Sequence, residues 1–130
     1  GLSDLPLDQH LAKFRDSNAI ASFVSVRPSQ SFHAVRADDH GRVTAVEPVT
    51  ASDYWINGGF FCMRQEIFDY VQPGEELVEQ PFKRLLSEQR LTTLKYEGYF
   101  GAMDTFKDKI TLDRMEARGD CPWMVWKSAK

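Results

Sequence analysis

Segments with the apolar spacing of helices alternate along this chain with short segments typical of strands. The helix-like segments are 6–18, 65–71, the stretch that begins at Pro81, and 105–118. The strand-like segments are 19–26, 31–37, 42–46 and 91–97. Strands that alternate with helices are typical of an α/β architecture, in which helices pack on a sheet. The sequence therefore predicts an α/β fold with a mixed sheet.

Two of the strand-like segments, 31–37 and 42–46, are separated only by the turn Asp38-Asp39-His40-Gly41. Aspartate and glycine are favoured in turns, and a four-residue connection suits two antiparallel strands. We therefore expect an antiparallel hairpin inserted into the α/β pattern.

Capping residues mark the ends of the expected helices. Asp4 or Ser3 is expected to cap the first helix, and Pro6 suits its first turn. Thr105 is expected to cap the last helix, with Asp108 at the third helical position completing a capping box. No linker or internal repeat divides the chain, so we expect residues 1–130 to form a single domain.

Composition excludes several functional classes. The 130 residues hold no apolar run near the ~20 residues that a membrane span needs, and the net charge of −3 argues against a nucleic-acid-binding surface. Cys62 and Cys121 lie far apart without a CxxC motif, which argues against a zinc module or a disulfide scaffold. These features and the lack of a visible secretory signal lead us to expect a cytoplasmic protein with neither a membrane nor a nucleic acid as partner.

The chain lacks the motifs of a self-sufficient nucleotide-binding or hydrolytic site. It contains neither GxGxxG nor GxxxxGK[ST], the loops that cradle phosphates, and no GxSxG nucleophile elbow. His10, His33 and His40 show no metal-ligand spacing, and each is expected at the surface.

The apolar segment 54–63 is interrupted by Asn57, Gly58 and Gly59. Glycine within a strand permits close approach of a ligand to the backbone, and the Asn57 amide can bind hydroxyl groups. A sugar lying flat against the two glycines is one interpretation. A β-bulge or tight packing against a neighbouring element is the other, and it is the commoner case for such a pattern.

Two carboxylates are further candidates. Asp104 lies just before the last helix, where it can bind Mg²⁺ together with substrate phosphates or serve only as the helix N-cap. Glu47 ends the expected hairpin, where it can bind a ligand hydroxyl or remain a solvated charge.

Several short motifs occur in a specific order. They are Ile56-Asn57-Gly58-Gly59-Phe60-Phe61, Glu79-Gln80-Pro81, Gly98-Tyr99-Phe100, Met103-Asp104-Thr105 with Lys107-Asp108-Lys109, Gly119, and Pro122-Trp123 with Trp126. In this order they resemble the sugar-phosphate nucleotidyltransferases, and among these the glucose-1-phosphate cytidylyltransferases. The resemblance covers nearly the whole chain and corresponds to the C-terminal portion of a Rossmann-like fold.

The resemblance implies an activity: transfer of a cytidylyl group from CTP to glucose 1-phosphate, giving CDP-glucose and pyrophosphate. It implies Mg²⁺ held by two aspartates, of which Asp104 matches the second. It also implies that Glu47, Asn57, Gly58 and Gly59 contact the sugar phosphate. The family's nucleotide-binding half is expected outside these residues, so we expect the chain alone to be inactive.

One departure from the family pattern concerns the phosphate. The family's Glu-Lys-Pro motif reads Val46-Glu47-Pro48 here, without the lysine that meets the sugar phosphate. Either another cation replaces it, or the protein is impaired or has changed its substrate. The alternative is therefore a non-catalytic sugar-phosphate-binding or assembly module, and homo-oligomerisation is compatible with both.

Overall fold

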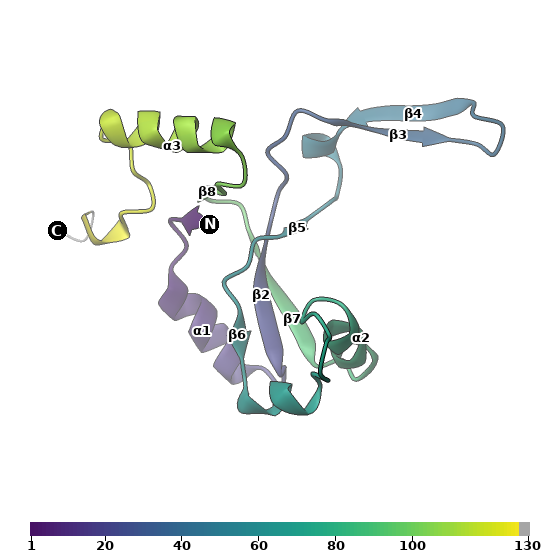
Figure 1. The fold of residues 1–130 in the computed structure, drawn as a ribbon, viewed down its shortest axis with the longest axis vertical. Helices are drawn as coiled ribbons and strands as arrows, with labels where there is room; N and C mark the ends of the chain where they lie inside the picture. The colour runs from purple at the N-terminus through teal and green to yellow at the C-terminus, as the bar shows by residue number, and fades with distance from the viewer. Residues whose placement is uncertain (128–130) are drawn as a thin grey trace.

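Strand β2 (Ala21–Val26) is the centre of the main sheet in the computed structural model, which describes residues 1–127 (Figure 1). Strand β7 (Leu91–Tyr96) pairs with it in parallel along its whole length. Along the other edge, β5 (Ile56–Asn57) and β6 (Cys62–Met63) pair with it antiparallel. Five of the six residues of β2 are buried, as expected for a strand with neighbours on both edges. The predicted α/β class and the mixed sheet are confirmed.

Helices α1 (Leu7–Asp16) and α2 (Gln80–Ser87) cover opposite faces of this sheet (Figure 1). Successive residues of a strand point to opposite faces, so the side chains of β2 belong to two separate hydrophobic clusters. On the α2 side, Ala21 packs with Phe82 and Leu85. On the other side, Val24 and Val26 pack with Leu5, which precedes α1.

The predicted hairpin is confirmed, but it lies outside the main sheet. Strands β3 (His33–Ala37) and β4 (Val43–Pro48) form a separate two-stranded ribbon that projects from the body (Figure 1). Its turn is closed by the Asp38 carboxylate, which accepts hydrogen bonds from the backbone N–H groups of His40 and Arg42 at 2.9 Å each. A short 3₁₀ helix, η1 (Val49–Ala51), follows the ribbon.

The last helix begins as the sequence predicts. In α3 (Phe106–Ala117), the Thr105 hydroxyl accepts a hydrogen bond from the Asp108 N–H, and the Asp108 carboxylate accepts one from the Thr105 N–H. This reciprocal capping box leaves no capping role for Asp104. Strand β8 (Phe100–Gly101) precedes the helix and pairs antiparallel with β1 (Leu2–Ser3).

The short helix expected at 65–71 is the 3₁₀ helix η2 (Gln65–Asp69), and a third 3₁₀ helix, η3 (Val125–Lys127), follows α3. Two local predictions were wrong. Neither Asp4 nor Ser3 caps α1: Pro6 holds the N-cap position without a side-chain bond. The Asp4 carboxylate instead accepts hydrogen bonds from the Tyr96 hydroxyl and, at 2.9 Å, from the Tyr99 N–H.

The second wrong prediction concerns His10, which is buried rather than exposed. Its Nε2 lies 3.1 Å from the carbonyl oxygen of Phe60, a residue fifty positions away, so a distant strand connection decides its burial.

Cys62 and Cys121 are free thiols, and burial raises the pKa of Cys62, which keeps that thiol neutral. None of the helices in residues 1–127 is long and apolar enough to cross a membrane.

The ion pair between Glu75 and Arg84 gives the fold an expected pH dependence. Arg84 donates from both terminal nitrogens to the Glu75 carboxylate, at 2.5 and 2.6 Å, and this lowers the Glu75 pKa from 4.5 to about 2. Between these values the unfolded chain binds more protons than the folded one. The stabilisation is therefore complete above pH 4.5 and is lost as the pH falls toward 2.

Replacing Glu75 by glutamine should remove this dependence. In urea unfolding, wild type should exceed E75Q in stability at pH 6, and the difference should vanish between pH 4.5 and 2. Glu76→Gln, at an exposed neighbour, is the control and should follow wild type. A constant difference across this pH range would contradict the assignment.

Candidate functional site

The Asn57-Gly58-Gly59-Phe60 turn, which we call the Asn57 turn, interrupts the pairing of β5 and β6 with β2. Ser25 pairs with Asn57, and Ser22 pairs with Cys62. These two pairs are three residues apart on β2 but five residues apart on the segment that joins β5 to β6. The two extra residues form a bulge, with positive φ of 80° at Gly59 and 52° at Phe60. The bulge interpretation of this segment is therefore correct at the level of the backbone.

The bulge is held against β2 on both sides. The Gly58 N–H donates to the Val24 carbonyl at 2.7 Å, and the Val24 N–H donates to the Gly59 carbonyl at 2.9 Å. A Cβ at position 58 would lie 3.1 Å from the Val24 carbonyl oxygen and from Val26 Cγ1. A side chain at position 58 would therefore crowd the backbone of β2, which glycine avoids. Buried His10 contacts the same turn at the Phe60 carbonyl.

The Asn57 side chain is exposed, and its orientation is fixed. Its Oδ1 accepts a hydrogen bond from the Gly59 N–H at 2.8 Å, which assigns the oxygen to that side of the amide. The amide NH₂ therefore points away from the turn and has no protein acceptor within residues 1–127. Two free donors on a rigid turn can bind the hydroxyl or phosphate oxygens of a ligand.

The Asn57 turn lies beside an open depression of about 270 Å³ at the carboxyl ends of β2 and β7. Its lining includes Val26, Arg27, Tyr96, Glu97 and Phe100. A Cβ at Gly58 would contact both Val26 and Phe100, so the turn borders this lining directly. The carboxyl ends of parallel strands are where ligands bind in open α/β sheets.

Hydrogen bonds hold the segment 96–99, part of which lines the depression. Burial and the hydrogen bond to Asp4 raise the pKa of Tyr96 to about 12, so its phenol stays protonated. The Ser3 hydroxyl donates to the Tyr99 carbonyl at 2.7 Å, which ties the same segment to β1.

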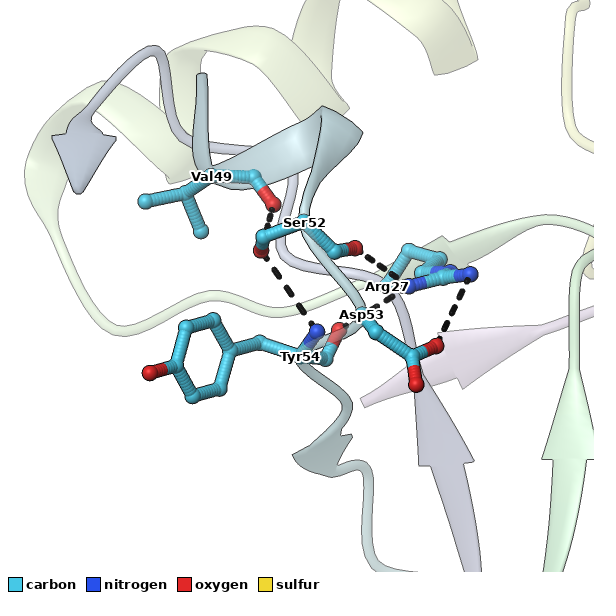
Figure 2. A network of polar contacts seen from close by, with 5 residues as sticks. All are labelled: Arg27, Val49, Ser52, Asp53 and Tyr54. Atoms are coloured by element: carbon cyan, nitrogen blue, oxygen red, sulfur yellow. Dashed lines mark hydrogen bonds and ion pairs between the residues drawn. The ribbon is translucent and has the colours of Figure 1, made fainter. Parts of the chain in front are cut away.

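Arg27, at the end of β2, holds the segment that returns from the hairpin (Figure 2). Its guanidinium donates to the Ser52 carbonyl at 2.7 Å and lies 3.8 Å from the Asp53 carboxylate. It also stacks over the Trp55 ring, 4.3 Å from the ring centroid. The sequence analysis did not find this residue, because its partners lie 25–28 positions away and share no motif with it.

Asp104 is exposed, and its carboxylate makes no hydrogen bond or ion pair within the described part of the chain. Only its backbone N–H is used, donating to the Asp108 carboxylate at 3.2 Å. Because Thr105 and Asp108 cap α3, the Asp104 carboxylate is free to bind a cation. A single carboxylate fits Mg²⁺, which takes one or two protein carboxylates and otherwise substrate phosphates and water. In residues 1–127, no cluster of three acidic, histidine or cysteine side chains gathers around it.

Glu47 lies on the projecting hairpin, apart from the Asn57 turn along the chain. It faces Ala34 across the ribbon and forms an ion pair with Arg36 at 3.6 Å. No hydrogen bond or ion pair among residues 1–127 joins Glu47 or Asp104 to the Asn57 turn. The structure therefore keeps Asn57, Gly58 and Gly59 together in one turn, and it places Glu47 on the hairpin and Asp104 just before α3.

Comparison with known proteins gives similarity over nearly the whole chain. The chain is 28% identical over 128 residues to the probable glucose-1-phosphate cytidylyltransferase of Bacillus subtilis (strain 168), and 29% identical over 135 residues to glucose-1-phosphate cytidylyltransferase of Salmonella typhimurium. These matches cover 97% and 98% of the chain, which spans about half the length of each relative. No family model matches. The similarity to glucose-1-phosphate cytidylyltransferases that the motifs indicated is confirmed.

Proposed function

We propose that this chain forms the sugar-phosphate-binding portion of a nucleotidyltransferase that makes CDP-glucose and pyrophosphate from CTP and glucose 1-phosphate. The observation that carries the proposal is the Asn57 turn, which has free amide donors and whose Gly58 borders the depression at the carboxyl ends of β2 and β7. The names of the similar proteins support the reaction class. As the chain spans half their length, the reaction is proposed for the whole protein.

The proposal gives the turn a role in binding the sugar. The Asn57 NH₂ donates to ligand oxygens, and Gly58 and Gly59 let a sugar ring approach the backbone closely. Glu47 is proposed as a second hydroxyl acceptor. This role requires the hairpin to lie near the bound sugar and its weak, exposed pair with Arg36 to open.

Asp104 is proposed as a carboxylate that holds Mg²⁺, and the ion, when bound, neutralises phosphate charge. In the reaction, an oxygen of the sugar phosphate attacks the α-phosphorus of CTP. A new P–O bond forms as the bond to pyrophosphate breaks. Phosphoryl transfer of this kind depends on positioning and charge stabilisation and needs little acid–base chemistry. This agrees with a site built from an amide, glycines and carboxylates rather than an activated nucleophile.

A sugar-phosphate-binding module without catalysis is the second candidate. One observation favours it: the lack of a lysine between Glu47 and Pro48. Both candidates bind a sugar phosphate at the Asn57 turn, so turnover separates them.

Binding at the turn can be tested with two substitutions at Asn57. Asn57→Asp keeps the acceptor for the Gly59 N–H but removes the NH₂ donors and adds a negative charge, so glucose 1-phosphate affinity should fall about tenfold or more, as expected for lost hydrogen bonds to a charged ligand. Asn57→Ala should lose the turn contact as well.

Hydrogen exchange supplies the measurement. Glucose 1-phosphate should slow exchange of the Gly59 amide in wild type, where only the exposed Asn57 side chain protects it. The effect should be lost in N57D. Unchanged exchange across residues 57–61 at saturating sugar phosphate would argue for a purely structural turn.

A further inference from the structure

Trp55 lies close to two cations that the sequence does not group together. The Arg27 guanidinium carbon is 4.3 Å from the centroid of the Trp55 ring, and the Lys95 Nζ is 5.3 Å from it. Both distances are within the range for cation–π attraction. We call these three residues the Trp55 cluster.

The strand pairing places this cluster beside the Asn57 turn. Ser25 of β2 lies opposite Asn57 on one edge and opposite Lys95 on the other, so the three residues form one row across the sheet. Paired residues point to the same face, and two strand spacings separate Asn57 from Lys95 by about 10 Å. This span suits a ligand with a hydroxylated ring at one end and an anionic group at the other.

The two cations keep most of their charge unpaired. Lys95 is exposed, and its ammonium has no acceptor among the described residues besides the Trp55 ring. Arg27 donates to main-chain carbonyls and faces one carboxylate, the highly exposed Asp53 at 3.8 Å, a contact that contributes little. Glu97 lines the same depression as Arg27, and the Asp4 carboxylate is occupied by the Tyr96 hydroxyl and the Tyr99 N–H. An anion placed beside the Trp55 ring would meet the charges of both Arg27 and Lys95.

The Trp55 indole is also incompletely bonded. Its Nε1–H is buried and, within residues 1–127, has no hydrogen-bond partner. A buried donor without an acceptor costs free energy, and phosphate oxygens are strong acceptors.

We propose that Lys95 and Arg27, which both lie over the Trp55 ring, form the site that binds the phosphate of a sugar 1-phosphate whose ring lies at the Asn57 turn. The inference rests on the proposed function for the identity of the sugar phosphate. In this inference Lys95 of β7 supplies the cation that the Val46-Glu47-Pro48 stretch lacks.

The Trp55 indole N–H signal in ¹H–¹⁵N NMR spectra reports on this site, and Trp55→Phe assigns it among the three tryptophans. Titration with inorganic phosphate or with glucose 1-phosphate should shift this signal, and glucose alone should not. Lys95→Met should weaken both titrations about tenfold or more. Lys83→Met, on α2, is the matched control and should stay within twofold of wild type.

The outcomes separate this inference from the proposed function. If glucose 1-phosphate shifts the Asn57-turn amides with equal affinity in wild type and K95M, the phosphate site is wrong and sugar-phosphate binding stands. If phosphate shifts the indole in a Lys95-dependent way but glucose 1-phosphate does not bind, the anion site stands and the sugar assignment fails. If neither ligand moves the indole signal, the inference is overturned.

Discussion

Replacing Asp104 by asparagine is expected to lower the rate of nucleotidyl transfer by the full natural polypeptide at least 100-fold. The proposal makes this carboxylate a ligand of Mg²⁺, and charge stabilisation by a bound metal contributes several kcal/mol to the transition state. Asparagine keeps the shape of the side chain but removes its charge. The measurement is the steady-state rate of pyrophosphate release as a function of Mg²⁺ concentration.

Stability should not change with this substitution, because the exposed Asp104 carboxylate makes no hydrogen bond in the described chain and α3 is capped by Thr105 and Asp108. Asp39→Asn, in the exposed hairpin turn, is the matched control and should keep the wild-type rate. A D104N variant with a rate within threefold of wild type would remove Asp104 from the site.

Leu85→Ala should destabilise the fold by about 3 kcal/mol, within the range seen when a buried leucine is truncated. Leu85 is fully buried on α2 and packs with Ile20, Ile67 and Phe82, so alanine would leave a cavity under the sheet. Urea unfolding followed by circular dichroism measures the loss.

The adjacent residue provides a matched control for the cavity. Leu86 has the same side chain on the same helix but is 61% exposed. Leu86→Ala should cost less than about 0.5 kcal/mol, as is usual for surface substitutions. Equal losses for the two variants would mean that α2 does not pack on the sheet as described.

Sequence patterns located the elements that depend on local chemistry. The apolar run at 19–26 and the alternation at 91–97 predicted β2 and β7, because a central strand needs side chains that can be buried on both faces. Thr105 and Asp108 predicted the start of α3, because a capping box is formed within four residues.

Contacts between distant segments were not predictable in the same way. From the sequence, Asp4 resembles an N-cap. In the structure its carboxylate instead accepts hydrogen bonds from Tyr96 and Tyr99, more than ninety positions away. From the sequence, His10 resembles a surface residue. In the structure it lies beside the Phe60 carbonyl. In each case the side chain alone permits two environments, and the tertiary fold selects one.

The candidate site also contains residues that the sequence could identify and residues that only the fold brings together. Asn57, Gly58 and Gly59 were visible because an amide and two glycines are unusual inside an apolar run. The Trp55 cluster was invisible, because Arg27 and Lys95 lie 68 positions apart and meet only when β2 and β7 pair. The two interpretations of the glycines proved compatible, since a bulge presents the Asn57 amide to solvent.

The most direct test of the central claim is pyrophosphate release by the full natural polypeptide with Mg²⁺, glucose 1-phosphate and each of the four nucleoside triphosphates in turn. The account predicts release with CTP, in equal amounts with CDP-glucose. No release with any of the four, from a protein that binds glucose 1-phosphate at the Asn57 turn, would contradict the nucleotidyltransferase assignment and leave a sugar-phosphate-binding module.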